Sequence, residues 1–231
     1  MIDLWSRYKK CYEQRAADYL VENAIGRSQR IDFTVSLLVT EKKGLLLDIG
    51  SADGLLAQKS GGIGCDISLT YCRRMKQKGI DVVNCVGESL PFADESFDIV
   101  TCTEVLEHVL HPQEVIEEIH RIVKSNGYGL ISVPYRQKHL SRQRKYEFTH
   151  LRRYDEKLAE NLPDVFSVES VSYYGFRFKP VRVFNPSLNK ILDRVWKLFG
   201  NFLNRMGGYV KPVYIFVLLT KKSWDSPQQR N

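Results

Sequence analysis

The chain of 231 residues lacks the features that mark secreted and membrane-spanning proteins. Its five cysteines are odd in number, scattered, and never in a C-x-x-C pair, so we expect free thiols in a reducing compartment. The longest apolar run, Val213 to Leu219, is far shorter than the roughly 20 residues of a spanning helix. Met1 to Arg7 has no long apolar core and does not fit a secretory signal. These absences favour a cytoplasmic protein.

The chain also lacks internal repeats, low-complexity tracts and a large excess of one charge. Its formal net charge of +7 permits an anionic partner but does not require one. Hydrophobic residues make up 43% and charged residues 26%, as in ordinary soluble globules. The length suits one α/β domain with its own core.

The glycine fingerprint of dinucleotide-binding folds, G-x-G-x-x-G, is missing, although a loop of small residues takes its place. An apolar run ends at Asp48 and continues into Gly50-Ser51-Ala52-Asp53-Gly54, and a second apolar run ends at Asp66. Acids beside a pyrophosphate would repel it. They suit a cationic ligand with an amino-acid end, such as S-adenosylmethionine, and the second acid can hold both ribose hydroxyls.

Four blocks of sequence, in the same order along the chain, resemble the class I S-adenosylmethionine-dependent methyltransferases, and among them the methyltransferase type 11-like family. The first motif of that class, D/E-x-G-x-G-x-G, resembles the loop from Asp48 to Gly54. The resemblance covers roughly residues 44–134, with a weaker tail near His150. The other blocks are Glu88 to Val100, Glu104 to Val109 and Ile119 to Gly127.

Strands that alternate with helical stretches predict right-handed crossovers and a mostly parallel sheet. The resemblance implies a Rossmann-like, doubly wound α/β sheet of seven strands with an antiparallel last strand. Asn126-Gly127 is typical of a helix stop. We expect strands at 44–49, 62–66, 82–86, 97–102, 127–133, 166–174 and 209–221, and helices at 4–21, 27–40, after Gly54, 69–78, 113–124 and 155–162.

We expect one domain over residues 1–231. It would consist of an N-terminal helical cover (1–43), a cofactor-binding half (44–134), an acceptor-side half (135–222) and a tail (223–231). A helical insertion is expected at about 176–208. Tyrosines of the first helix either cover the cofactor or pack on the sheet.

Two segments of the acceptor-side half leave alternatives open. Tyr135 to Arg153 holds seven Lys or Arg against one acid, with aromatic residues between them. This composition fits a nucleic-acid stacking site or a solvated loop. Residues 188–205 alternate apolar and basic side chains at helical spacing, which fits contact with an anionic membrane surface or, more commonly, packing on the domain or a second subunit.

The resemblance implies roles for several cofactor-binding residues. Asp48 and Gly50 would hold the amino-acid end of S-adenosylmethionine, Asp66 the ribose hydroxyls, and Ile67 would flank the adenine. The alternative for Asp66 is a helix N-cap, because a helix is predicted just after it. The other expected contacts are Ser51, Ala52, Asp53, Gly54, Gly87, Glu88 and Thr103.

One position departs from the family pattern. Relatives often carry an aspartate that bonds to the adenine amino group where this chain has Val86. Either the backbone around Gly87 and Glu88 holds the adenine, or the pocket is altered.

The spacing E-x-x-E-H at Glu104, Glu107 and His108, with His150 further on, resembles a magnesium site of quinone O-methyltransferases and small-RNA 2′-O-methyltransferases. Two carboxylates and two imidazoles could hold a divalent ion that lowers the pKa of an acceptor hydroxyl. The same string occurs in relatives without metal, where Glu107 and His108 orient the loop and a histidine serves as base. We favour the metal-free version and predict these four residues as catalytic.

The function predicted from the resemblance is methyl transfer from S-adenosylmethionine to a small-molecule, lipid or glycan-like acceptor, at oxygen. One alternative is an RNA methyltransferase that uses residues 135–153. The other is a non-catalytic S-adenosylmethionine-binding domain.

Overall fold

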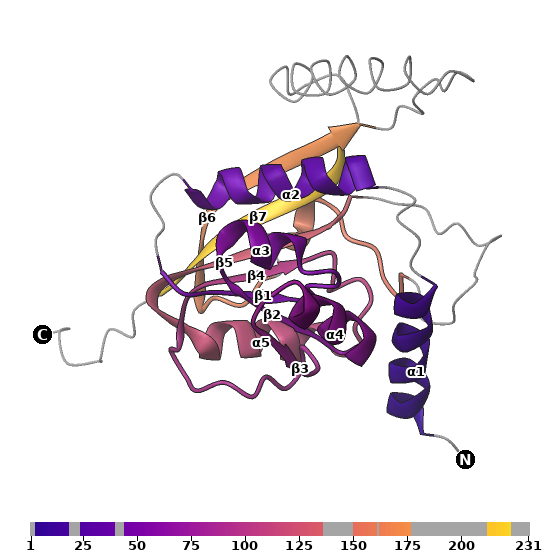
Figure 1. The fold of residues 1–231 in the computed structure, drawn as a ribbon. Coiled ribbons are helices and arrows are strands. Elements are labelled where there is room, and N and C mark those ends of the chain that lie inside the picture. The colour runs from indigo at the N-terminus through magenta and orange to yellow at the C-terminus, as the bar shows by residue number, and fades with distance from the viewer. Residues whose placement is uncertain are drawn as a thin grey trace, which may run out of the picture.

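The computed structural model describes residues 3–18, 24–39, 44–135, 150–160, 162–176 and 212–222. Their centre is one seven-stranded sheet in the order β3-β2-β1-β4-β5-β7-β6 (Figure 1). Strands β1 to β5 pair in parallel, and β7 runs antiparallel to both of its neighbours. The predicted fold class is confirmed. The strands are β1 (Leu46–Ile49), β2 (Ile63–Asp66), β3 (Val82–Asn84), β4 (Phe97–Thr103), β5 (Val123–Pro134), β6 (Phe166–Phe176) and β7 (Pro212–Lys221).

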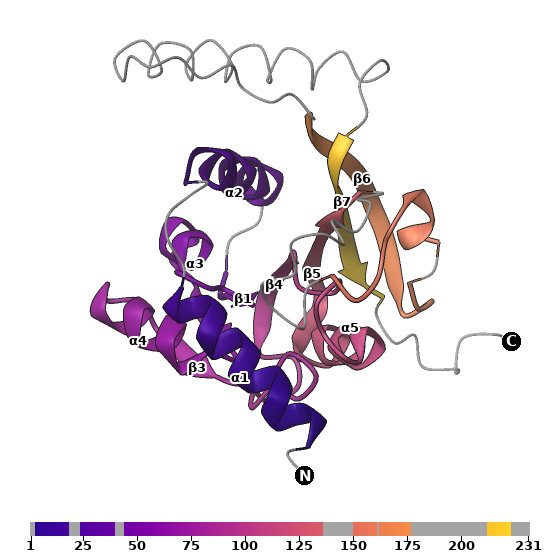
Figure 2. The same cartoon turned by 90° about the vertical axis from the view of Figure 1, so that its right-hand side faces the viewer.

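Helices cover both faces of the sheet (Figure 2). On one face, Leu38 packs against Leu46, Leu130 and Phe216. On the other face, Val115 and Ile119 pack into the larger core. All four residues of β1 are buried, as expected for a parallel strand covered on both sides. The helices are α1 (Leu4–Ala17), α2 (Ala24–Val39), α3 (Leu55–Ser60), α4 (Leu69–Gln77), α5 (Pro112–Ile122) and the 3-10 helix η1 (Glu156–Leu158).

The predicted helix stop at Asn126-Gly127 is wrong. Helix α5 ends at Ile122, and β5 begins at the next residue. Phe97 pairs with Val123 while Ile99 pairs with Tyr128, so β5 makes an excursion between these two pairs. Asn126 has φ +63° within this excursion. The Asn-Gly pair therefore marks a turn inside a strand rather than the end of a helix.

The helix predicted at 155–162 is also wrong, because the structure has only the 3-10 turn η1 there. The Asp155 carboxylate accepts a hydrogen bond from the Lys157 amide at 3.0 Å, which favours a local turn. Pro163 then follows too soon for a longer helix.

Several predicted segments lie outside the described residues. They are the insertion at 176–208 beyond Phe176, the amphipathic stretch 188–205, most of the basic segment 135–153, and the tail 223–231. In the part of the chain that is described, no helix is both long and apolar enough to cross a bilayer.

Candidate functional site

The loop after β1 turns sharply at the carboxyl edge of the sheet. Gly50 and Ala52 both have left-handed backbones, with φ of +69° and +52°. A Cβ added at Gly50 would lie 2.4 Å from Cγ2 of Val105, so this position requires glycine for space as well as for conformation. The loop is thereby packed against the segment that follows β4.

Asp48 lies beneath this loop and is 2% exposed. Its carboxylate accepts hydrogen bonds from the Ser51 hydroxyl at 2.7 Å and from the Thr101 hydroxyl at 2.8 Å. Asp48 therefore ties the loop to β4. Thr101 had not been predicted as its partner, and only its place on the neighbouring strand could have indicated it.

Asp66, at the end of β2, joins two backbone segments. One carboxylate oxygen accepts from the Ala52 amide and the other from the Ser68 amide, both at 2.9 Å. The N-cap of α4 is Ser68, whose hydroxyl accepts from the Tyr71 amide, so Asp66 is not the cap. Burial raises the pKa of Asp66 to about 6, although the two amides act in the opposite direction.

One pocket opens above these residues. Among the predicted site residues, those in its wall are Gly50, Ala52, Asp66, Ile67, Gly87, Glu88, Glu104 and His108. Asp48, Ser51, Asp53, Gly54, Thr103, Glu107 and His150 are not in the wall. The pocket is also lined by Tyr8, Tyr12, Ile49, Cys65, Tyr71, Cys85, Val86, Val105 and Val109, and by Arg15, which the sequence had not singled out.

Glu104 begins the loop after β4 with a left-handed backbone, φ +59°. Its carboxylate accepts a hydrogen bond from the Ser132 hydroxyl at 3.2 Å and lies 3.5 Å from a guanidinium nitrogen of Arg30 on α2. Burial raises the pKa of Glu104 to about 7, and the nearby Arg30 charge limits the rise. Glu104 thus links the start of this loop to α2 and β5.

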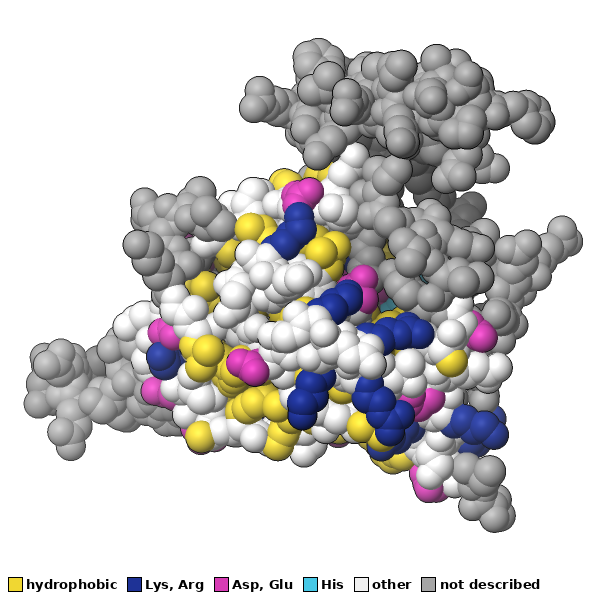
Figure 3. Space-filling view, in the orientation of Figure 1, with side chains coloured by type: hydrophobic (Ala, Val, Ile, Leu, Met, Phe, Trp, Pro, Cys, Tyr) yellow, Lys and Arg dark blue, Asp and Glu magenta, His cyan; other side chains and the backbone are white. Residues whose placement is uncertain are grey.

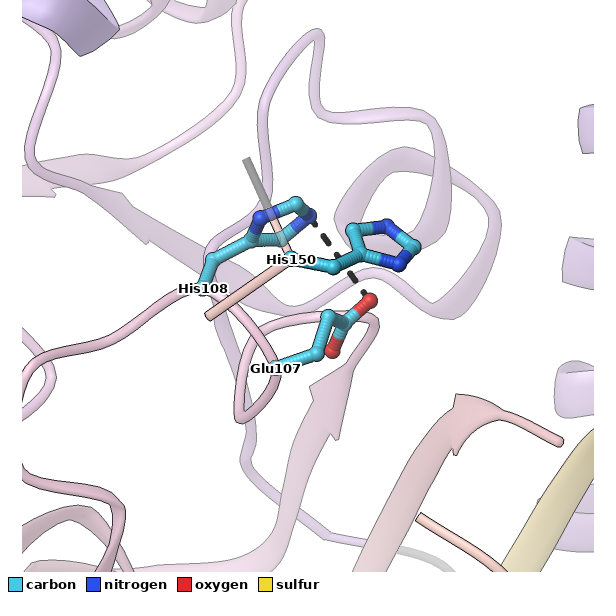
Figure 4. Close-up of side chains that lie close together, drawn as sticks. All are labelled: Glu107, His108 and His150. Atoms are coloured by element: carbon cyan, nitrogen blue, oxygen red, sulfur yellow. Dashed lines mark ion pairs between the residues drawn. The ribbon is translucent and has the colours of Figure 1, made fainter. Parts of the chain in front are cut away.

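Glu107, His108 and His150 form a compact group (Figure 4). His108 Nε2 lies 3.7 Å from Oε1 of Glu107. The centroids of the His108 and His150 rings are 4.8 Å apart. Neither carboxylate oxygen of Glu107 has a hydrogen-bond partner among the described residues, and nor does His108 Nδ1. Burial raises the pKa of Glu107 and lowers that of His108, so both groups favour their neutral forms.

A short strap, residues 150–154, holds this group in place. The Arg152 guanidinium donates to the carbonyls of Leu106, Val109 and Leu110, at 2.8 Å for Leu106 and 3.1 Å for Leu110. The Leu151 amide donates to the Glu107 carbonyl at 2.7 Å. Arg152, one of the seven basic residues counted above, is therefore committed to the loop after β4 rather than presented to an anionic partner.

Comparisons with known proteins agree with the fold. A family described as a methyltransferase domain matches residues 47–131. An uncharacterised protein of Methanocaldococcus jannaschii is 38% identical over 92 residues, 39% of this chain and 45% of that protein. A ubiquinone biosynthesis O-methyltransferase of Photobacterium profundum is 33% identical over 99 residues, 38% of this chain and 42% of that protein. The match thus spans less than half the length of both relatives.

Among solved structures, a SAM-dependent methyltransferase of Thermotoga maritima superposes with a TM-score of 0.66. The superposition covers 92% of this chain and 99% of that one, at 20% identity. At this level of identity the likeness concerns the fold.

Proposed function

We propose that this chain is an S-adenosylmethionine-dependent methyltransferase and that it transfers a methyl group from S-adenosylmethionine to an oxygen atom of a small acceptor. The observation that supports this most is the compact group of Glu107, His108 and His150 beside the pocket that Asp66 and Glu88 line. The O-methyltransferase among the relatives favours oxygen as the acceptor atom.

The residues around the pocket fit this cofactor. Each Asp66 oxygen accepts one amide, which aims the carboxylate and leaves each oxygen able to accept a ribose hydroxyl as well. Gly50 and Ala52 bring backbone close to the amino-acid end, and Ile67 lies where it can flank the adenine. Because Val86 stands where relatives often carry an aspartate, the backbone at Gly87 and Glu88 would bind the adenine edge. Asp48, Ser51, Asp53, Gly54 and Thr103 act from outside the pocket wall, as supports of the loops.

Bound there, S-adenosylmethionine supplies an activated methyl group. The chain has to orient an acceptor hydroxyl, take up its proton and exclude water. The low pKa of His108 keeps its imidazole neutral at pH 7, as a base must be. The imidazole of His108 accepts the proton of the acceptor hydroxyl, and its Nε2 lies 3.7 Å from Oε1 of Glu107. Glu107 is the carboxyl group next to the resulting imidazolium, and Glu104 keeps the loop in place.

The test is a pair of measurements on His108→Ala and His150→Ala. Calorimetry with S-adenosylhomocysteine measures cofactor binding, and release of that product in the presence of hydroxylated small molecules measures methyl transfer. We expect transfer to fall by about 10²–10⁴-fold for His108→Ala while binding changes little. His120→Ala is the control, because His120 packs against Phe166 and is not in the pocket wall. Transfer that survives both substitutions would remove these histidines from the mechanism.

A metal-assisted version of the same reaction has one observation in its favour. Ligand atoms of Glu107, His108 and His150 lie within 4.8 Å of one another, whereas Glu104 contacts Arg30 and Ser132 instead. A magnesium ion there would lower the pKa of the acceptor hydroxyl. This version requires that a chelator abolish activity and that magnesium restore it. Activity that is unaffected by the chelator leaves His108 as the base.

A further inference from the structure

Helix α1 forms one wall of the pocket through three residues of one face. Tyr8, Tyr12 and Arg15 follow one another at helical spacing, and all three line the pocket. The rings of Tyr8 and Tyr12 are 4.9 Å apart, and the Arg15 guanidinium carbon lies 5.0 Å from the centre of the Tyr12 ring. The Arg15 side chain therefore lies along the pocket wall.

The place of α1 is fixed by hydrogen bonds to α4. The Glu13 carboxylate accepts from the amides of Leu69 and Thr70 and from the Ser68 hydroxyl. At the other end of the contact, the Arg74 guanidinium donates to the Ala16 carbonyl at 2.8 Å. Ser68 also donates its amide to Asp66, so the turn that aims Asp66 also anchors α1.

The pocket wall carries more acidic than basic side chains. Asp66, Glu88 and Glu104 contribute carboxylates, and Arg15 is the single Lys or Arg among the described residues of the wall. Other cations of this region, such as Lys10 and Arg73, lie in an outer groove between α1 and α4. Figure 3 shows Lys and Arg side chains gathered on the outer surface over these helices.

The Arg15 charge acts on groups at both ends of the site. Burial is the main cause of the shifted pKa values of Asp66, Glu107 and His108, and the Arg15 charge lowers the pKa of all three. Its guanidinium is thus within electrostatic reach of both the Asp66 end and the His108 end of the pocket.

We propose that Arg15 binds the carboxylate of the amino-acid end of S-adenosylmethionine. This assignment rests on the proposed function. The cofactor carries two cationic groups, the sulfonium and the ammonium, which suit the acidic wall, and one carboxylate, which does not. A guanidinium is the side chain best matched to a carboxylate, because its planar fork can donate two parallel hydrogen bonds. Asp48 does not compete for this end, since its carboxylate is engaged beneath the loop with Ser51 and Thr101.

The experiment compares two ligands that differ in the carboxylate. Calorimetry with S-adenosylmethionine and with decarboxylated S-adenosylmethionine is run on the wild-type chain, Arg15→Ala, Arg15→Lys and the outer-groove control Lys10→Ala. We expect Arg15→Ala to weaken binding of S-adenosylmethionine by roughly tenfold or more. Its affinity for the decarboxylated ligand should stay within about twofold of wild type. Arg15→Lys should lie between wild type and Arg15→Ala, and Lys10→Ala should match wild type.

The outcomes separate this assignment from the function itself. Equal losses for both ligands would show that Arg15 only shapes the wall, and unchanged affinity for S-adenosylmethionine would equally overturn the proposal. Should Arg15→Ala fail to fold, Arg15→Lys provides the same comparison between ligands. A wild-type chain that binds neither ligand would instead refute the proposed function.

Discussion

Asp66 accepts a backbone amide on each of its oxygens, from the loop after β1 and from the turn before α4. A residue that joins two loops in this way fixes the shape of the pocket before any ligand arrives. The cost of this placement is visible in its pKa, which burial raises to about 6. The same carboxylate is therefore both part of the scaffold and a group that titrates near neutral pH.

The ribose contact proposed for Asp66 predicts that cofactor binding depends on pH. The ionised carboxylate accepts hydroxyl hydrogen bonds, so affinity for S-adenosylhomocysteine should fall as the pH decreases through about 6. We expect Asp66→Asn to weaken binding by about 1–3 kcal/mol at pH 8 and to abolish most of the pH dependence. Calorimetry at pH 8 and pH 5 on both proteins checks this. The same pH dependence in the variant would assign it to another group.

The stability of the ligand-free chain should depend on pH in the opposite direction to cofactor binding, through the same Asp66 carboxyl. The pKa of Asp66 is higher in the folded chain than its ordinary value, so the folded state binds the proton more tightly. The stability that Asp66 contributes is present at low pH and is lost as the pH rises through about 6. The change falls between the ordinary pKa of 3.8 and about 6, so urea unfolding of wild type and Asp66→Asn between about pH 4 and pH 7 should show this difference in slope. Parallel curves would contradict it.

Gly50 is a second residue at which a small change should have a large effect. Gly50→Ala adds a Cβ at 2.4 Å from Val105 Cγ2 and forces alanine into φ +69°. We expect a loss of about 1–3 kcal/mol in the free energy of unfolding, with weaker cofactor binding. Adding Val105→Ala should relieve the clash but not the backbone strain, so the double variant should recover only part of the loss. Full recovery in urea titrations would show that backbone strain is negligible.

At the scale of elements, the strap 150–154 illustrates what the sequence could and could not predict. Alternating apolar runs and turn residues predicted the strands and most helices, and the run of small residues indicated the tight turn after β1 that contacts Asp66. These signals are local in sequence. The contact of Arg152 with Leu106 joins residues 46 positions apart, and no periodicity encodes it. Asn126-Gly127 failed for a related reason, because the dipeptide specifies a turn but not the element that contains it.

The strap leads to a prediction about catalysis. Arg152→Ala removes hydrogen bonds to three carbonyls of the loop that carries Glu107 and His108. Because none of the residues in contact with Asp66 is involved, we expect methyl transfer to fall at least tenfold while affinity for S-adenosylhomocysteine changes less than about threefold. Arg153→Ala, at the exposed neighbouring position, is the control. Equal losses of binding and turnover would mean that the strap supports the whole pocket.

At the scale of the whole molecule, β7 joins the edge strand β6 to the rest of the sheet. It lies between β5 and β6 and buries Ile215, Phe216, Val217 and Leu219. The residues matched by the methyltransferase family, 47–131, end before this strand. Without β7, strand β5 would therefore become an open edge of the sheet.

We expect a chain that ends at residue 211 to fail to fold. Loss of β7 removes two strand pairings and four buried apolar side chains, each contributing about 1.5–3 kcal/mol through burial. Val217→Asp should have the same effect at full length, whereas Lys222→Asp, exposed just past the strand, should not. Far-UV circular dichroism and urea titration are the measurements. A cooperative transition in the shortened chain would show that β1 to β6 are sufficient.

The position of β7 also bears on how the chain emerges from the ribosome. Strand β6 ends at Phe176 and its partner begins at Pro212, so β5 and β6 both wait for a strand that is translated later. At about 5–20 residues per second, the delay is on the order of seconds, long compared with hairpin formation. During that interval the nascent chain exposes two unpaired strand edges, which are sites for chaperone binding or for mispairing with neighbouring chains.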